Sequence, residues 1–160
     1  MKIYCDMDMV LCDFLRAAET LTGEPFPKKD GKLTKDQKKA MISSKKDFWH
    51  TLPWTSDGRK LWKAITSNPE NQVMILSAYA EWDKNCKPGK KAWIKKNLKP
   101  SPSRVYLVKR HEKSNYADDD SILIDDYARN TSDWNKKGTN GITHINTNST
   151  ISKLKKLGII

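Results

Sequence analysis

Short apolar runs alternate along the chain with polar stretches that carry helical periodicity. Runs of four or five apolar residues predict strands, and the segments between them place apolar residues three or four apart, which predicts helices. This alternation is typical of an α/β fold built on a mostly parallel five-stranded sheet. The predicted strands are residues 2–5, 73–76, 104–108, 121–124 and 141–145.

Glycine and proline mark the limits of the predicted helices. Gly23, Gly138 and Gly158 each follow a periodic segment and are expected to end a helix. Pro88 suits the first turn of a helix, where its missing N–H is not needed. The predicted helices are residues 14–21, 38–43, 59–65, 90–98, 128–137 and 150–157.

One segment breaks the alternation. Residues 24–47 are polar and basic, and Thr34 and Gln37 stand in the spacing of a helix capping box. Because the segment lies between the first and second predicted strands, we interpret it, together with residues 48–54, as a small helical cap inserted over the sheet edge. A chain of 160 residues suits one buried core. We therefore predict a single domain, residues 1–160, with the cap inside residues 15–66.

Composition adds a strong positive charge. Thirty Lys and Arg against 19 Asp and Glu give a formal charge of +11, which attracts phosphorylated ligands, including nucleic acid. The alternative explanation is a solvated basic surface, because much of the excess stands as Lys pairs on polar faces. Three cysteines outside any CxxC fit a reducing compartment, and no apolar run approaches membrane-spanning length. We expect a cytoplasmic protein with no membrane partner, in the host cytoplasm if it is phage-encoded.

Acidic residues end two of the predicted strands. Asp6 and Asp8 share one face if the first strand stays extended, and Asp125 and Asp126 end the run "SILIDD". In open α/β sheets, ligands bind beyond the carboxyl ends of the strands, so these acids are expected at one edge. Carboxylates at such short distances repel one another unless a cation or a shared proton neutralises them. Hard oxygen ligands of this kind suit Mg²⁺. The sequence therefore predicts a magnesium site there, although a lone DxD also occurs in other enzyme classes and on loops.

Four segments carry a family resemblance. In order along the chain, "DMDMVLCDF", "VMILSA", the Lys113 of "HEKSNYA" and "ILIDD" resemble the four motifs of the haloacid dehalogenase (HAD) superfamily of phosphotransferases. Within it, "DFW" before a Leu-Pro, "CKPGKKAWIKKN" and "LIDDYARNTSDWNKKG" are similar to the 5′(3′)-deoxyribonucleotidase family, including its short phage and bacterial members. The resemblance implies a Rossmann-like HAD fold and a Mg²⁺-dependent phosphatase of deoxyribonucleoside or ribonucleoside monophosphates.

The same resemblance implies roles for the acids. Asp6 would attack phosphorus and become a phosphoaspartate, and Asp8 would protonate the leaving alcohol and then activate the hydrolytic water. The metal would be held by the Asp6 carboxylate, the backbone carbonyl of Asp8 and one acid of the Asp125–Asp126 pair. We favour Asp126 for that ligand.

Substrate contacts are also implied by position. The implied phosphate-binding residues are Ser77, the Ala78 amide and Lys113, and the competing cations are Lys109, Arg110 and Lys90. A nucleobase needs a flat apolar surface, and the family places aromatic contacts where this chain has Phe14, Phe48, Trp49 and His50. Taken singly, Phe48 and Trp49 fit a core position better than a ligand contact.

Two questions remain open in the sequence. Met9 stands where the family usually has Gly, whose backbone freedom Met does not share, so Met9 is expected to narrow the pocket or reshape the loop. The high charge also leaves two alternative functions: a phosphatase of phosphorylated nucleic-acid ends, and a catalytically silent nucleic-acid-binding protein. Oligomeric state is not determined by any pattern in the chain.

Overall fold

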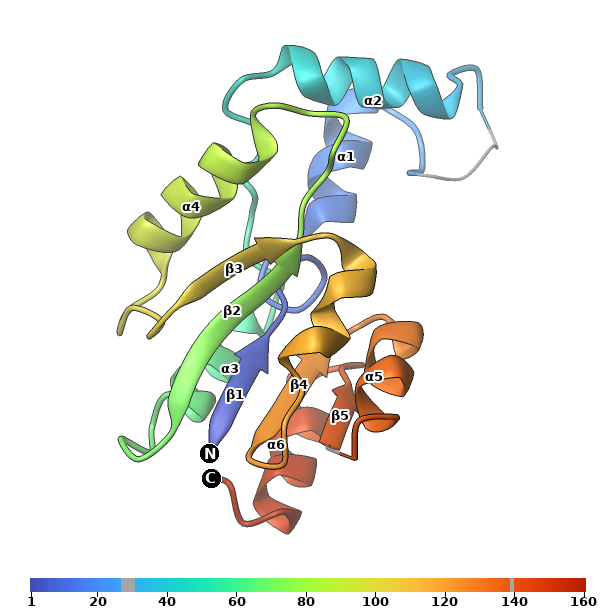
Figure 1. The fold of residues 1–160 in the computed structure, drawn as a ribbon. Helices are drawn as coiled ribbons and strands as arrows, with labels where there is room; N and C mark the ends of the chain where they lie inside the picture. The colour runs from blue at the N-terminus through green and yellow to red at the C-terminus, as the bar shows by residue number, and fades with distance from the viewer. Residues whose placement is uncertain (27–30, 139) are drawn as a thin grey trace.

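A single parallel sheet organises the chain. The computed structural model describes residues 1–26, 31–138 and 140–160; residues 27–30, within the predicted cap and its basic stretch, and residue 139 lie outside the described part. All strand pairs are parallel, and the order β3-β2-β1-β4-β5 puts β1 at the centre (Figure 1). The strands are β1 (Lys2–Cys5), β2 (Gln72–Ala78), β3 (Val105–Val108), β4 (Ser121–Asp125) and β5 (Asn140–Thr143).

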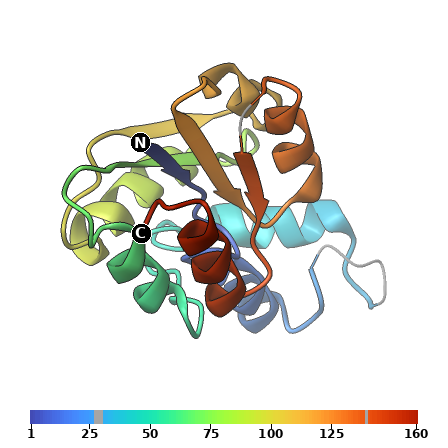
Figure 2. The same cartoon turned by 90° about the horizontal axis from the view of Figure 1, so that it is seen from below.

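Helices cover both faces of this sheet. Seen from below, α5 and η1 lie on one face, whereas α3, α4 and α6 lie on the other (Figure 2). The helices α1 and α2 stand above the carboxyl ends of the strands (Figure 1). The helical elements are α1 (Phe14–Thr22), α2 (Lys35–Ser44), α3 (Gly58–Ile65), α4 (Cys86–Asn97), the 3₁₀ helix η1 (Arg110–Tyr116), α5 (Ala128–Asn135) and α6 (Thr147–Lys156).

The apolar runs form the central strands because both faces of those strands are covered. Every residue of β4 is buried, as are the five residues 73–77 of β2, which explains why these strands are apolar without alternation. Alternate side chains enter two separate cores. Ile3 and Cys5 of β1 join the larger core beneath α3, α4 and α6, while Tyr4 joins the smaller one with Trp134 of α5.

Side-chain caps define several helix ends. Asp13 accepts a hydrogen bond from Arg16 N at the start of α1, and Gly23 ends that helix in the left-handed conformation (φ 74°). Thr34 and Gln37 form the predicted capping box of α2. These short-range signals explain why both helices were predictable within a few residues.

The predicted fold class is confirmed, with one refinement and one addition. The sheet is wholly parallel within the described residues, and the five strands occupy the predicted segments. The additional element is η1, which begins directly after β3 and was not predicted, because a 3₁₀ segment lacks the 3.6-residue periodicity used to find helices. Among the described helices, none is long and apolar enough to cross a membrane.

Strand register places the first acid at the centre of one sheet edge. Cys5 pairs with Ile75 of β2 on one side and with Ile124 of β4 on the other. The next residue, Asp6, donates its backbone N–H to the carbonyl of Ile124 at 2.9 Å. The end of β1 is therefore held between two longer strands, both of which also end near polar residues.

Candidate active site

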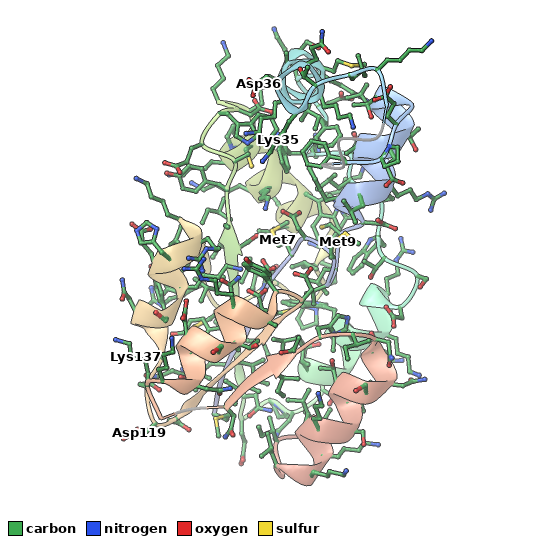
Figure 3. All side chains as sticks on the ribbon, turned by 90° about the vertical axis from the view of Figure 1, so that its right-hand side faces the viewer. Met7, Met9, Lys35, Asp36, Asp119 and Lys137 are labelled. Atoms are coloured by element: carbon green, nitrogen blue, oxygen red, sulfur yellow. The ribbon has the colours of Figure 1, made fainter. Side chains whose placement is uncertain are left out.

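A tight turn follows β1 and carries Asp8 and Met9. The carbonyl of Met7 accepts hydrogen bonds from three successive backbone N–H groups, those of residues 10, 11 and 12, at 2.8–3.1 Å. Met9 has φ 63°, in the left-handed region that costs a residue with a side chain about 1–2 kcal/mol, and its own N–H bonds the Cys12 carbonyl at 2.7 Å. Met9 therefore adopts a glycine-like backbone. Figure 3 shows Met7 and Met9 near the middle of the molecule, between the sheet and the end that carries Lys35 and Asp36.

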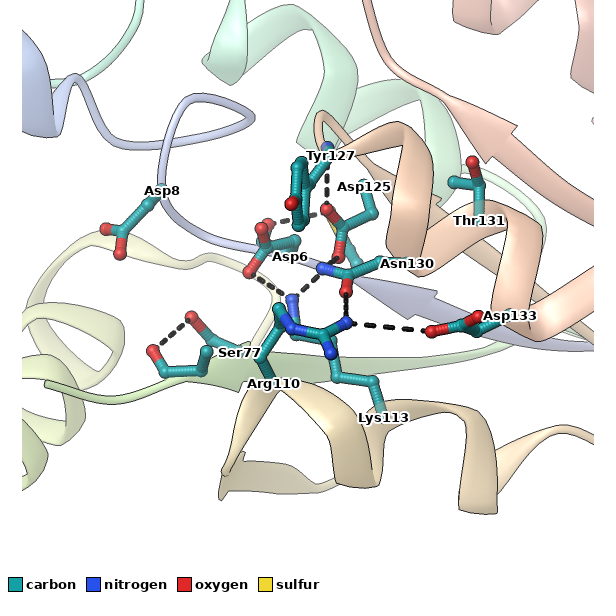
Figure 4. Close-up of polar contacts among 12 residues, drawn as sticks. Asp6, Asp8, Ser77, Arg110, Lys113, Asp125, Tyr127, Asn130, Thr131 and Asp133 are labelled. Carbon is teal, nitrogen blue, oxygen red and sulfur yellow. Dashed lines mark hydrogen bonds and ion pairs between the residues drawn. The ribbon is translucent and has the colours of Figure 1, made fainter. Parts of the chain in front are cut away.

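Three carboxylates converge beside this turn. One oxygen each from Asp6, Asp125 and Asp126 lie within 4.8 Å of one another. Asp6 and Asp125 are buried, whereas Asp126 is exposed. The Nζ of Lys113 lies 2.6 Å from Asp125 Oδ2 and 3.1 Å from Asp6 Oδ1 (Figure 4). The cluster thus holds three acids against one ammonium group.

This excess of negative charge raises carboxyl pKa values. Burial and the nearby Asp6 raise the pKa of Asp125 to about 6, against the lowering effect of Lys113. The pKa of Asp126 is raised to about 7 by desolvation and by repulsion from Asp6 and Asp125, although its side chain is the exposed member of the cluster. Burial alone would lower the pKa of Lys113, but Asp6 and Asp125 reverse this and hold it above its ordinary range. A divalent cation beside these acids would remove their mutual repulsion.

Asp125 is fixed by a chain of neutral and cationic donors. Its Oδ1 accepts from Tyr127 N at 2.9 Å, and its Oδ2 accepts from Asn130 Nδ2 at 3.0 Å as well as from Lys113. Asn130 in turn accepts from Arg110 Nη1 at 3.1 Å (Figure 4). Both oxygens of Asp125 are therefore occupied by donors, whereas Asp126 has no hydrogen bond or ion pair with another described residue.

A second buried lysine lies on the other side of β1. Lys90 of α4 places its Nζ 2.8 Å from Asp8 Oδ2, 3.0 Å from Ser77 Oγ and 2.7 Å from the carbonyl of Ala78. Burial alone would lower the pKa of Lys90, but Asp8 leads the charges that raise it above its ordinary value. Among the described residues, Asp8 Oδ1 has no hydrogen-bond partner. Asp8 is thus held through one oxygen, while the other is buried and has no partner in the described structure.

The position of Lys90 depends on a glycine. A Cβ on Gly89 would stand 2.6 Å from Trp49 Cβ, so a larger residue would push the first turns of α4 away from the segment that follows α2. With Gly89 in place, the Nζ of Lys90 also lies 5.5 Å from the ring centre of Trp49, within cation–π range.

The other competing cations lie away from the three clustered acids. Lys109 pairs with Glu81 at 3.4 Å, and both side chains are exposed. Arg110 turns toward Asn130 and lies 3.6 Å from Asp133. The structure therefore brings Lys113 and Lys90 to the acids, and it places Lys109 on the surface.

The predicted aromatic contacts form a packed cluster. Phe14 stacks on Trp49 with an interplanar angle of 15° and ring centres 5.4 Å apart, and Phe48 meets both rings edge-on. Phe48 and Trp49 are each 2% exposed, and Trp49 Nε1 donates to Asp83 Oδ2 at 2.7 Å. His50 is half-buried beside them. Phe14, Phe48 and Trp49 therefore fill the space between the cap and the sheet.

Sequence reasoning missed Asn130 and Tyr127, and it considered Arg110 only as a phosphate ligand. Asn130 stands four residues after Asp126, on the first turn of the helix that follows the acids, and that spacing is the signal that could have found it. Arg110 opens η1, which has no periodic pattern, so its contact with Asn130 has no comparable signal.

Comparison with solved structures gives relatives of the fold. A hydrolase from Streptococcus pneumoniae TIGR4 matches with a TM-score of 0.61 at 9% identity, over 96% of this chain and 97% of that one. L-2-haloacid dehalogenase from Xanthobacter autotrophicus matches with a TM-score of 0.57 at 9% identity, over 99% and 84%. A HAD family enzyme from Bacteroides thetaiotaomicron, in complex with magnesium and inorganic phosphate, matches with a TM-score of 0.51 at 16% identity, over 89% and 92%.

These structural neighbours are HAD-superfamily hydrolases, and the predicted HAD fold is confirmed. No family model matches the sequence, and no curated protein matches it. The deoxyribonucleotidase family within the superfamily stays a prediction.

Proposed function

We propose that this protein is a divalent-metal-dependent phosphatase that hydrolyses deoxyribonucleoside or ribonucleoside monophosphates. One observation carries the proposal: Asp6 lies in a cluster of three carboxylates with one buried lysine, while Asp8, two residues later, is held by a second buried lysine. The first arrangement suits a metal and a nucleophile. The second suits a proton carrier beside a phosphate site. The HAD hydrolase fold supports the same class of reaction.

The first half-reaction forms a covalent intermediate on Asp6. A carboxylate oxygen of Asp6 attacks phosphorus, the bond from phosphorus to the nucleoside oxygen breaks, and Asp8 gives that leaving oxygen a proton. We assign this proton to the carboxyl group of Asp8, whose side chain is 31% exposed, while its Oδ1 is buried without a partner among the described residues. Lys90 holds the other oxygen, so the carboxyl group keeps one orientation during the transfer.

The second half-reaction returns the enzyme to its starting state. Asp8, now a carboxylate, takes a proton from a water molecule as the water attacks the phosphorus of the phosphoaspartate. The bond from phosphorus to Asp6 breaks and inorganic phosphate leaves. Asp8 keeps the proton taken from water and can donate it to the leaving oxygen in the next cycle. Dividing one displacement into two easier steps is the general advantage of covalent catalysis.

The phosphate would be bound between the two lysines. Ser77 and Ala78 end β2 beside Lys90, and Lys113 contacts Asp6. We propose that the Ser77 hydroxyl, the Ala78 amide and both lysines neutralise the phosphate oxygens, whose charge grows more exposed as the bond breaks.

The metal would be held by Asp6 and Asp126, with Asp125 oriented behind them. Among the described residues the Asp126 side chain has no hydrogen bond or ion pair, whereas Asp125 already has donors on both of its oxygens. A carboxylate donor set with few protein ligands suits Mg²⁺, which keeps water in its shell and binds substrate phosphate. When bound, the ion would screen the repulsion between the phosphate and the attacking carboxylate.

The test is phosphate release from a panel of nucleoside monophosphates with and without Mg²⁺. We expect turnover that requires Mg²⁺ and that falls by about 10⁴-fold or more in Asp6→Asn, because the nucleophile is lost. Circular dichroism of Asp6→Asn checks that the fold is retained. An absence of turnover for every monophosphate up to millimolar concentration would overturn the proposal.

A second candidate is a phosphatase of phosphorylated nucleic-acid ends. The charge of +11 favours it, as does a hollow of about 550 Å³ between α3 and α6, on the flank of the molecule away from the acids, whose lining includes Lys60, Lys63 and Lys155. The two candidate functions are separated by measuring phosphate release from a 3′-phosphorylated oligonucleotide and from a free nucleotide at increasing salt concentration. A preference for the oligonucleotide that collapses with salt would favour this candidate.

A further inference from the structure

We infer that the ring of Tyr127 is the surface on which the flat aromatic group of the substrate stacks. This inference rests on the proposed phosphatase function and adds a specificity-determining residue to it. The predicted base contacts Phe14, Phe48 and Trp49 are packed against one another, whereas the ring of Tyr127 is open and lies next to the acids.

The cap aromatics are already stacked on one another. One face of Phe14 is covered by Trp49, and the edges of Phe26 and Phe48 meet it from other sides. Since Phe48 and Trp49 are each 2% exposed, a base could reach them only if the cap moved off the sheet. In the described structure these rings serve as the apolar support of the cap.

Tyr127 has the opposite character. It is 49% exposed, the highest value among the aromatic side chains that the structure describes. Its ring has no hydrogen bond and no aromatic or cationic partner among the described residues. An exposed aromatic ring without a partner is a site of favourable contact for a flat ligand.

The backbone fixes where this ring stands. Tyr127 follows Asp126 directly, and its N–H donates to Asp125 Oδ1 at 2.9 Å. Figure 4 shows Tyr127 at the same strand end as Asp6 and Asp125. A substrate whose phosphorus faces Asp6 therefore has an open aromatic side chain beside it, on the β4 side of the site.

Trp82 is the competing exposed ring, and its surroundings are different. It is 37% exposed on the loop after β2, but Lys39 of α2 stands 5.5 Å from its ring centre and Trp49 packs beside it at 6.2 Å. Those contacts give Trp82 a role in joining the loop to the cap. It is therefore the matched control for Tyr127.

The inference predicts a preference for aromatic over aliphatic phosphomonoesters. Stacking of one base on an aromatic side chain corresponds to roughly a tenfold difference in affinity or more, so removing the ring should raise KM about tenfold for aromatic substrates. The catalytic rate should change little, because Tyr127 does not touch the reacting atoms. The side chain makes no capping hydrogen bond to α5, so Ala at this position leaves the helix start intact.

The experiment compares wild type, Tyr127→Ala, Tyr127→Phe and Trp82→Ala with Mg²⁺ on two substrates, thymidine 5′-monophosphate and glycerol 2-phosphate. We expect Tyr127→Ala to raise KM for the nucleotide about tenfold, with kcat within about twofold and with kcat/KM for glycerol 2-phosphate unchanged. Tyr127→Phe should behave as wild type, because the stacking face is kept. Trp82→Ala should leave the ratio of the two substrates unchanged.

Three outcomes would overturn the inference while the phosphatase function stands: equal losses on both substrates in Tyr127→Ala, no loss on the nucleotide, or the selective loss appearing in Trp82→Ala. Calorimetric binding of thymidine 5′-monophosphate to Asp6→Asn, with and without Tyr127→Ala, tests stacking without turnover. If wild type releases no phosphate but the nucleotide binds about tenfold more weakly without the ring, the function fails and the stacking surface stands. Equal binding with and without the ring overturns the inference by itself.

Discussion

Two buried lysines flank the end of β1, and they differ in the charge that surrounds them. On the β4 side, Lys113 faces Asp6 and Asp125, with Asp126 near by, so one ammonium group meets three carboxylates. On the β2 side, Lys90 meets one carboxylate, Asp8, and two neutral oxygen acceptors.

The difference shows that burial of a charged residue does not by itself define its role. The Lys90 side is balanced, because each formal charge has one partner and the remaining ammonium hydrogens have acceptors. The Lys113 side carries an excess of negative charge that raises the pKa of Asp125. A second cation would fit the Lys113 side and would have no charge to neutralise on the Lys90 side.

Removing each lysine gives the largest contrast in stability. Lys113→Met should lower the free energy of unfolding by about 3–5 kcal/mol, because it leaves buried carboxylates without a counter-ion. Lys90→Met should cost about 1–3 kcal/mol, because Asp8 is partly exposed and can regain water. Urea denaturation of metal-free protein measures both changes.

Magnesium sharpens this contrast. Mg²⁺ binds only the folded cluster. It should therefore reduce the difference in free energy of unfolding between Lys113→Met and wild type, and it should leave the difference between Lys90→Met and wild type unchanged. Equal recovery in the two variants would show that the two sides do not differ in charge as described.

The pH dependence of stability tests the charge excess directly. The pKa of Asp125 is about 6 in the folded protein and near 3.8 when unfolded, so between these values the folded state binds more protons. The stabilisation is complete below about pH 4 and is lost as pH rises through about 6, an effect of roughly 3 kcal/mol.

Chemical denaturation of metal-free protein from pH 4 to pH 8 measures this slope. Asp125→Asn should make the slope shallower, with the raised pKa of Asp126 giving the part that remains, and Mg²⁺ should flatten it for the wild type. Stability that rises across the same window in metal-free wild type, with a slope that Asp125→Asn leaves unchanged, would contradict the proposed repulsion.

Asn130 offers a smaller test on the same side. Asn130→Ala removes the donor to Asp125 and the acceptor for Arg110, so we expect a loss of about 1–2 kcal/mol in stability. Metal affinity should fall about tenfold or more, because Asn130 orients Asp125 behind the two proposed ligands, Asp6 and Asp126. Asn97→Ala, at a partly buried hydrogen-bonding asparagine far from the acids, serves as the control, with comparable destabilisation and unchanged metal affinity.

Lys109 should show the smallest effect. Its pair with Glu81 is exposed on both sides, so Lys109→Ala should change stability by less than about 1 kcal/mol and leave phosphate release unaltered. A large loss of activity would mean that Lys109, rather than Lys113 or Lys90, reaches the substrate.

The sequence was most informative where structure follows from local pattern. The five strands could be placed because the central ones are buried on both faces, and Thr34 with Gln37 marked the start of α2 through bonds three residues apart. The parallel topology alone predicted that Asp6, Asp125 and Asp126 lie at one edge of the sheet, beyond the carboxyl ends of the strands.

What could not be read from the sequence depends on contacts between distant segments. Lys90 and Lys113 look alike in the sequence, and only the fold shows that Asp8 pairs with one and Asp125 with the other. The chain from Arg110 through Asn130 to Asp125 joins elements that have no shared periodicity. Whether an aromatic residue is packed, as Trp49 is, or open, as Tyr127 is, likewise follows from neighbours that lie far along the chain.

The central position of β1 has a consequence for the order of events during synthesis. Lys2 pairs with Gln72 and Ser121, so the first strand to leave the ribosome waits for partners made much later. At 5–20 residues per second, that wait is roughly 6 to 24 seconds. Because Asp6 meets Asp125 and Asp126 only after β4 has emerged, a shortened nascent chain that lacks this strand exposes an apolar N-terminal segment and has no assembled carboxylate cluster.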